Sequence, residues 1–226
     1  MKDSQQYVLP LFGNDQYILD NFINSPSNQV AYNSIKNWSV TWGSKPYELT
    51  VLLYGPSSSG KTYLSKIWQN LSNAFFIKKD SDILSVEHIM QYNAFIMEDI
   101  EFWHERNVLH CFNLISECRK YLLMTTGSLA NNFALQDLLS RVNSVLRLEI
   151  KQPDDELMSK LIFKYFSDQS VKVSDCVTKY LLINLPRQFD QMTKLLGTIT
   201  HYALVHKRPI TISLIKYVLN ANPLMS

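Results

Sequence analysis

A loop in the first quarter of the sequence has the residue types and spacing of a phosphate-binding site. Gly55 and Gly60 frame it, and Lys61 and Thr62 follow at once, which completes the pattern G-x-x-x-x-G-K-[ST]. The glycines let successive backbone N–H groups turn toward a phosphate, and a following helix adds its positive N-terminus. The lysine of such a loop reaches the β- and γ-phosphates, and the threonine hydroxyl holds Mg²⁺. We expect phosphate binding by the whole loop, which comprises Gly55, Pro56, Ser57, Ser58, Ser59, Gly60, Lys61 and Thr62.

A pair of carboxylates follows the apolar run 94–97. Glu98 and Asp99 come directly after it, and Glu101 follows two residues later. An isolated Glu-Asp pair is most often a solvated turn. Some 37 residues beyond a phosphate loop, however, an acidic strand end can bring one carboxylate to the Mg²⁺ shell and a second to the attacking water. We therefore predict catalytic roles for Glu98 and Asp99, and a metal site formed by Thr62, Glu98 and Asp99.

Apolar runs separated by helical patterns predict the elements that position these residues. Strands are expected at 51–54, 94–97, 121–124 and 145–150, and a helix is expected from Lys61. This alternation indicates a parallel α/β sheet. From Pro153 onward the spacing of apolar residues is helical, with further helices predicted at about 174–184, 186–205 and 211–220. We place a domain boundary near residue 152.

Composition excludes several classes of protein. With 226 residues, 46% of them apolar and 12% aromatic, the chain is globular and not intrinsically disordered. A net charge of +2 is too small for a strongly basic nucleic-acid footprint, and three cysteines without a C-x-x-C pair indicate neither a disulfide framework nor a zinc site. The polar N-terminus and the lack of a long apolar segment favour a cytoplasmic protein without a membrane anchor.

Taken together, the phosphate loop, the acidic strand end and the helical C-terminal part resemble AAA+ ATPases of the DnaA family, and within it the short regulators called Hda. The resemblance covers nearly the whole chain. It implies an α/β fold class, with an AAA+ P-loop parallel-sheet domain followed by a small helical lid domain. The implied division is an extended tail over 1–14, the nucleotide-binding domain over 15–152 and the lid over 153–226.

The resemblance also assigns roles to single residues. The segment that contains Asn28 would lie against the adenine and ribose, and Thr126 would end the sensor-1 strand. Arg141 would be an arginine finger that acts on the nucleotide of a neighbouring subunit, because a guanidinium at the subunit edge can stabilise a transferring phosphoryl group. Arg187, next to Pro186 at the predicted start of a lid helix, matches the sensor-2 position and would contact a phosphate.

Two departures from the family pattern bear on catalysis. Glu98 occupies the place of the Mg²⁺-binding aspartate, and residues 125–128 read Thr-Thr-Gly-Ser where the initiator has an aspartate and an arginine. We therefore expect binding of ADP or ATP with Mg²⁺, and weak or absent hydrolysis by this chain itself.

The N-terminus resembles the clamp-binding peptide of Hda proteins, with an N-terminal edge strand as the alternative. The peptide residues would be Gln6, Val8, Leu9, Pro10 and Leu11. The implied partners are the replicative sliding clamp and the DnaA initiator, with a homo-oligomer as a further candidate and no sequence-specific DNA binding of its own. The resulting hypothesis is a regulator that promotes ATP hydrolysis by the initiator and prevents re-initiation of replication. The alternative is a mechanical ATPase of the helicase- or clamp-loader type, and a small-molecule kinase is disfavoured.

Overall fold

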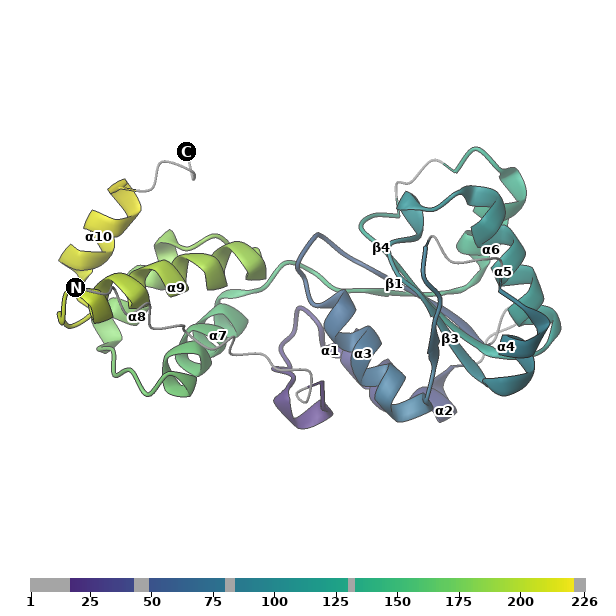
Figure 1. Cartoon of the computed structure of the whole chain (residues 1–226), viewed down its shortest axis with the longest axis horizontal. Helices are drawn as coiled ribbons and strands as arrows, with labels where there is room; N and C mark the ends of the chain where they lie inside the picture. The colour runs from purple at the N-terminus through teal and green to yellow at the C-terminus, as the bar shows by residue number, and fades with distance from the viewer. Residues whose placement is uncertain (1–16, 43–48, 80–83, 130–132, 222–226) are drawn as a thin grey trace, which may run out of the picture.

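A five-stranded parallel sheet forms the centre of the N-terminal part (Figure 1). The computed structural model of the chain describes residues 17–42, 49–79, 84–129 and 133–221. The strand order is β2-β3-β4-β1-β5. Their bounds are β1 Thr50–Tyr54, β2 Phe75–Phe76, β3 Ala94–Met97, β4 Tyr121–Thr126 and β5 Leu146–Glu149.

Helices cover both faces of this sheet, as the apolar runs require. Side chains alternate along a strand, so Val51 and Leu53 of β1 pack on one face while Leu52 packs on the other. The first face is covered by α1 and α3, and the second by α4, α5 and α6. The helices and short 3-10 turns of this part are η2 Leu19–Asn21, α1 Gln29–Lys36, α2 Trp38–Thr41, α3 Lys61–Ser72, α4 Val86–Gln91, η3 Ile100–Phe102, α5 Glu105–Glu117 and α6 Gln136–Ser144.

The carboxyl ends of the three central strands meet at one edge. Tyr54 of β1 pairs with Thr126 of β4, and Met97 of β3 pairs with Met124 of β4. The segments that follow these strands therefore emerge side by side, which is where ligands bind in open parallel sheets.

The C-terminal part is a separate helical layer with its own core. Its helices are α7 Asp155–Asp168, α8 Asp175–Asn184, α9 Phe189–Val205 and α10 Ile212–Ala221. Asp154 caps the first of them, since its Oδ1 accepts a hydrogen bond of 2.7 Å from the Leu157 N–H. The core brings together buried side chains such as Ile162, Leu181 and Ile215 from three of the helices. An extended segment joins this layer to the sheet (Figure 1).

The predicted fold class is confirmed: the chain has an α/β parallel-sheet part and a helical lid. One helix start differs from its expectation. The helix expected at 186–205 begins only at Phe189, after the N-cap Gln188. Arg187 therefore lies before the helix and not in its first turn. The domain boundary at residue 152 stays a prediction, and the predicted tail 1–14 lies outside the described residues.

Candidate functional site: a phosphate loop under a helical lid

The phosphate loop connects β1 to α3, and its two glycines are required for different reasons. A Cβ on Gly55 would lie 2.2 Å from the carbonyl oxygen of Ile150, so any side chain there would collide with the backbone. Gly60 is the N-cap of α3 and has φ +104°, a conformation that side chains disfavour. Lys61 and Thr62 then open the helix. The loop thus has the backbone that its sequence pattern predicts.

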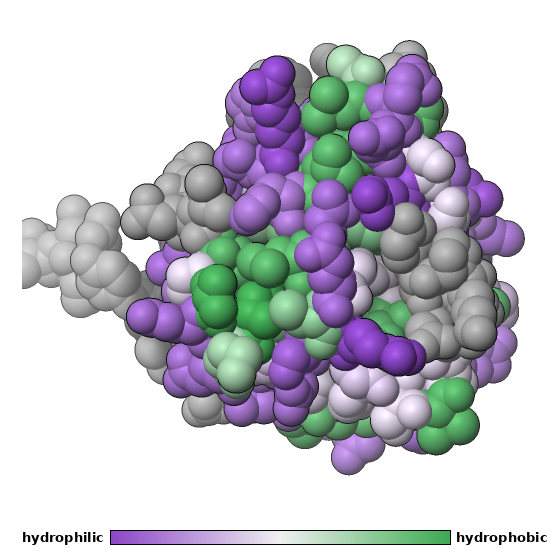
Figure 2. Space-filling model, turned by 90° about the vertical axis from the view of Figure 1, so that its right-hand side faces the viewer, coloured by the Kyte–Doolittle hydropathy of each residue, from purple (hydrophilic) through white to green (hydrophobic). Residues whose placement is uncertain are grey.

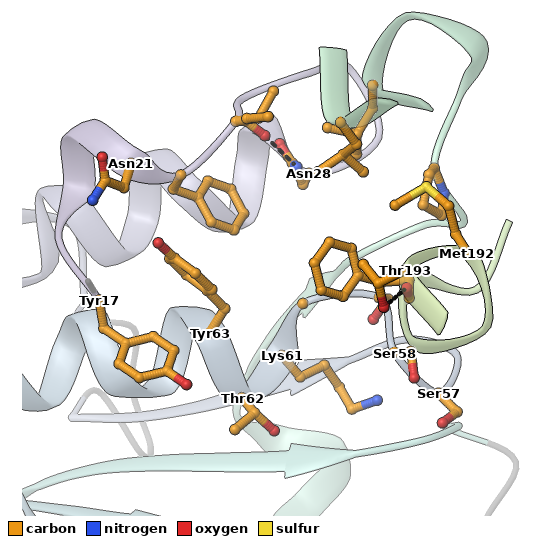
Figure 3. Close-up of a pocket in the computed structure, with 18 of the residues that line it drawn as sticks. Tyr17, Asn21, Asn28, Ser57, Ser58, Lys61, Thr62, Tyr63, Met192 and Thr193 are labelled. Atoms are coloured by element: carbon orange, nitrogen blue, oxygen red, sulfur yellow. Dashed lines mark hydrogen bonds between the residues drawn. The ribbon is translucent and has the colours of Figure 1, made fainter. Parts of the chain in front are cut away.

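A cavity of about 610 Å³ lies between this loop and the lid (Figure 3). The α/β part contributes loop residues 57–62 and the aromatic side chains of Tyr17, Phe22 and Tyr63. The lid contributes mainly apolar side chains from α7 and α9, which sequence reasoning did not identify. These lid residues are Leu157, Leu161, Tyr165, Phe189 and Met192.

Lys61 is buried at the floor of the site, with 7% of its surface exposed. Its Nζ donates hydrogen bonds to the carbonyl oxygens of Gly55, at 2.8 Å, and Pro56, at 3.0 Å. Burial lowers the pKa of Lys61, while the nearby carboxylates of Asp99, Glu101 and Glu98 oppose this shift in that order. The ammonium group is therefore held beside the loop by its own backbone, close to where phosphates would bind.

Glu98 lies behind Thr62 and does not line the cavity. Burial raises the pKa of its carboxyl group, and interaction with the hydroxyls of Thr62 and Ser65 counteracts the rise. The Oε1 atom of Glu98 is buried without a hydrogen-bond partner. The contact brings Thr62 and Glu98 together, and the unpartnered oxygen is an unsatisfied acceptor beside them.

Asp99 and Glu101 are the carboxylates that line the cavity from the sheet side, while Asp168 at the end of α7 lines it from the lid. Asp99 has φ +50°, and its N–H donates a 2.9 Å hydrogen bond to the Thr125 hydroxyl. Glu101, which the sequence prediction left out of the site, accepts a 2.5 Å hydrogen bond from the Gly127 N–H through Oε1, while its Oε2 is buried and unpartnered. The sequence shows that Glu101 lies two residues after Asp99. Only the structure shows that the 3-10 turn η3 places Glu101 in the lining of the cavity.

An aromatic wall closes the side of the cavity that the N-terminal segment forms. Phe22 stacks on Tyr32 with ring centroids 5.5 Å apart, and it also contacts Tyr63 at 5.5 Å. Tyr17 meets Tyr63 edge-on at 5.0 Å. Phe22 and Tyr63 both line the cavity, so two rings are available to an apolar or aromatic ligand group.

Asn28 lines the cavity, and its amide group is engaged in hydrogen bonds within its own segment. Its Oδ1 accepts from the Ser25 N–H at 2.9 Å, and its Nδ2 donates to the Ile23 carbonyl oxygen at 3.1 Å. The preceding residue, Ser27, is tied to the lid, since its N–H donates to Asp154 Oδ2 at 3.2 Å. Asn28 therefore shapes the segment that joins the two parts around the cavity.

Comparison with known proteins identifies the lid and the fold. Residues 155–219 match the model of the Hda lid domain. The chromosomal replication initiator protein DnaA of Buchnera aphidicola subsp. Cinara cedri is 23% identical over 237 residues, which covers 92% of this chain and 53% of the initiator. The chain thus spans about half the length of the curated relatives it matches.

Solved structures give the same result for the fold. Domain III of the Thermotoga maritima initiator DnaA is similar with a TM-score of 0.75 at 15% identity, covering 92% of this chain and 97% of that one. AMPPCP-bound DnaA from Aquifex aeolicus is similar with a TM-score of 0.67 at 21% identity, covering 83% of this chain and 66% of that one. The chain is thus similar to the initiator DnaA in sequence and in fold. Its C-terminal helices form an Hda-type lid.

The structure of this DnaA-like protein does not bring the predicted sensor residues into the cavity. Arg187 is absent from the lining residues, and its guanidinium is bound instead by the Pro153 carbonyl oxygen at 2.9 Å and by Asp155 Oδ1 at 2.5 Å. The buried Thr126 hydroxyl donates to the Ser128 carbonyl oxygen at 3.2 Å and likewise does not line the cavity. Of the two threonines, it is Thr125 that contacts the acidic strand end.

Of the two remaining predicted sites, one lies away from the cavity and the other falls outside the described residues. Arg141 is in the last turn of α6, half-buried, with its guanidinium 5.7 Å from the centroid of the Phe112 ring. It does not line the cavity of its own chain, so an action on nucleotide would have to occur across a subunit boundary. The peptide Gln6 to Leu11 lies outside the described residues. Within the described ranges, no helix is long and apolar enough to cross a membrane.

Proposed function

We propose that this DnaA-like protein is an adenine-nucleotide-binding regulator of the DnaA initiator, tethered to the sliding clamp, that promotes hydrolysis of the initiator's ATP. The observation that carries the proposal is the cavity in which a complete phosphate loop faces an Hda-type lid. Because the relatives are initiators and the lid match is of Hda type, replication control is the process that both comparisons support.

The two ends of the cavity suit the two parts of an adenine nucleotide. Loop residues 57–62 present N–H groups and hydroxyls to phosphates, and Phe22 and Tyr63 offer aromatic surface to a base. A volume of about 610 Å³ lies within the usual range for small-molecule sites. DnaA from Aquifex aeolicus was solved with the ATP analogue AMPPCP, which supports the same ligand class here.

The residues near the loop also fit Mg²⁺. The donors are all oxygens, from the Thr62 hydroxyl and the carboxylates of Glu98 and Asp99, and one Glu98 oxygen is buried without a partner. The described residues hold no group of three or more His, Cys, Asp or Glu side chains able to hold a metal, which suits Mg²⁺ because this ion usually takes only one or two carboxylates together with substrate phosphates. Bound Mg²⁺ would neutralise phosphate charge, while Thr62 and Glu98 position it.

Nucleotide-dependent capture of both partners tests the proposal. Purified sliding clamp and DnaA should be retained by the tagged protein with ADP or ATP present. Leu9→Ala combined with Leu11→Ala should abolish clamp retention while lowering the melting temperature by no more than about 1–2 °C, because a groove-binding peptide lies outside the folded core. Capture of neither partner, or a large loss of thermal stability in the double variant, would contradict the tether.

Arg141 gives the sharper test of the regulatory step. Its position outside its own cavity, and the apolar patches on the face that carries α5 and α6 (Figure 2), support contact with a neighbouring AAA+ subunit. Arg141→Ala should keep nucleotide and clamp binding and lose stimulation of the initiator's ATPase, by about 10³-fold if it acts as arginine fingers do in GTPases. Arg147→Ala, an exposed arginine on β5, is the matched control. Unchanged stimulation in Arg141→Ala would make it an ordinary surface residue.

A mechanical ATPase is the second candidate. Two of the carboxylates that line the cavity, Asp99 and Glu101, favour it because they lie near Lys61, where an attacking water would need orientation. Steady turnover by the isolated protein, stimulated by DNA, would support the motor. Tight retention of ADP without turnover would support the regulator.

A further inference from the structure

The carboxylate of Glu105 joins the starts of two neighbouring helices. Glu105 is the first residue of α5, and its Oε1 accepts a 2.9 Å hydrogen bond from the Ala134 N–H, while its Oε2 accepts a 2.7 Å bond from the Leu135 N–H. Leu135 is the N-cap of α6 and forms no side-chain capping bond of its own. In a capping box, a glutamate of the same helix binds the N-cap N–H. Here a glutamate of the adjacent helix α5 does so.

The ionised form of Glu105 is favoured at this place. The hydrogen bonds from the Ala134 and Leu135 N–H groups lower the pKa of its carboxyl group, so the side chain is negatively charged at neutral pH. The charge lies at the N-terminal ends of both α5 and α6, where the helix dipoles are positive. A carboxylate that accepts two bonds from consecutive N–H groups also fixes their direction, which a single neutral bond does less well.

Helix α5 contacts α6 a second time, near the end that carries Arg141. The Arg141 guanidinium lies 5.7 Å from the centroid of the Phe112 ring, which belongs to α5. The two contacts are about 10 Å apart along α5 and about 9 Å apart along α6, at about 1.5 Å per residue. The two helices therefore lie side by side, as Figure 1 shows, and α5 holds α6 at both ends.

The core alone would not fix α6 in one place. Leu138 and Val142 bury its inner face in the same hydrophobic cluster as Phe112, but apolar burial has no preferred direction. The helix spans only Gln136–Ser144, a length at which an isolated helix is marginal in water. The bonds from Glu105 therefore add the directional contacts that set how far α6 extends and how it is turned, and with them the place of Arg141.

We propose that Glu105 is a positioning residue for Arg141, which by holding the start of α6 fixes where the guanidinium meets the nucleotide of a neighbouring subunit. The inference rests on the proposed function, in which Arg141 acts on the initiator's ATP. Glu105 itself does not line the cavity of its own chain. A guanidinium that stabilises a transferring phosphoryl group must be placed closely, since a displacement of about 1 Å can cost about 100-fold in rate.

The test is the initiator's ATP hydrolysis, measured against increasing concentrations of this protein in the presence of the sliding clamp. Glu105→Ala should lower the maximal rate about tenfold and change the half-saturating concentration less than twofold, because docking is retained while the guanidinium is misplaced. Glu105→Gln keeps one acceptor oxygen, so its maximal rate should lie between those of Glu105→Ala and the unaltered protein. Glu117→Ala removes an exposed acid from the other end of α5 and should leave the rate unchanged.

Two further variants separate positioning from stability. Ser85→Ala removes the side-chain cap of α4, which covers the same face of the sheet, and should lower the melting temperature without lowering the maximal rate. Glu105→Ala combined with Arg141→Ala should stimulate hydrolysis as weakly as Arg141→Ala alone, because the effect of Glu105 passes through Arg141. Circular dichroism and the melting temperature show that each variant is folded at the temperature of the assay.

The inference would be overturned by an unchanged maximal rate in Glu105→Ala, by a further loss in the double variant, or by an equal loss in Ser85→Ala. A change confined to the half-saturating concentration would also overturn it, since Glu105 would then act in docking. If Arg141→Ala itself kept full stimulation, the regulatory step of the proposed function would fall, and this inference with it. If Arg141→Ala lost stimulation and Glu105→Ala did not, the proposed function would stand and only the positioning role would fall.

Discussion

The two walls of the cavity differ in how they are built. On the sheet side, the residues that line the cavity follow the ends of strands, and their backbone fixes their positions. Gly60 is the N-cap of α3, and the Asp99 N–H donates a hydrogen bond to the Thr125 hydroxyl. On the lid side, the lining is mainly apolar, its polar members are Lys164, Asp168 and Thr193, and the expected arginine is bound elsewhere. The sheet wall is suited to recognising phosphate, while the lid wall is suited to covering the less polar part of a ligand.

The largest effect is expected on the sheet wall. Lys61→Ala should weaken ADP and ATP binding by about 100-fold, about 2.7 kcal/mol, because it removes the buried cation beside the loop. Calorimetry measures the affinity, and circular dichroism checks that the fold is retained. Lys36→Ala on the exposed end of α1 is the control, and equal affinity in both variants would place the phosphates elsewhere.

A smaller effect is expected on the lid wall. Phe189→Ala removes a ring that lines the cavity and should weaken nucleotide binding about tenfold, with similar losses for ADP and ATP, because the contact would be made to the part they share. Phe163→Ala is the matched control, since this ring on α7 is 71% exposed and does not line the cavity. A loss of affinity for ATP alone would mean that Phe189 acts near the phosphates. The lid wall would then take part in phosphate recognition, contrary to the comparison above.

Arg187 should contribute less to nucleotide affinity than its sequence position suggests. Its partner Asp155 is largely exposed, so Arg187→Ala should lower the melting temperature by no more than about 2–3 °C and change nucleotide affinity less than twofold. Fluorescence titration with a labelled nucleotide would measure this. A tenfold loss of ATP affinity would restore the sensor-2 assignment and show that the lid rearranges when nucleotide binds.

The smallest expected effect is a change in thermal stability when Glu98 is substituted. Its pKa is raised by burial, so the ionised carboxylate destabilises the fold as pH rises from the unfolded pKa through the folded one. Glu98→Gln removes this cost and should raise the melting temperature near pH 7 by about 2 °C, while it weakens the dependence of ATP binding on Mg²⁺. The stabilisation should vanish below pH 4. A variant that is less stable at pH 7 would mean that the Thr62 contact outweighs burial.

Local patterns were enough to predict the sheet wall. The phosphate loop follows an apolar strand and precedes a helix within about twenty residues, and strands in parallel sheets align their carboxyl ends. Placement of the loop near Glu98 and Asp99 therefore follows from element order alone. The glycine at position 60 needs no distant contact to explain it, because its positive φ is a property of the loop itself.

Tertiary structure decided the lid wall. Which lid side chains face the loop depends on where α9 begins and how the helical layer packs over the sheet, and both are set by contacts between residues far apart in the chain. Because α9 starts at Phe189, Phe189 and Met192 line the cavity, while Arg187 lies before the helix and is bound by Asp155 of α7. The side chain of Arg187 therefore does not continue the face of α9 that lines the cavity. The sequence determined that a phosphate loop and a helical C-terminal part exist, and only their packing determined which side chains the lid places over the loop.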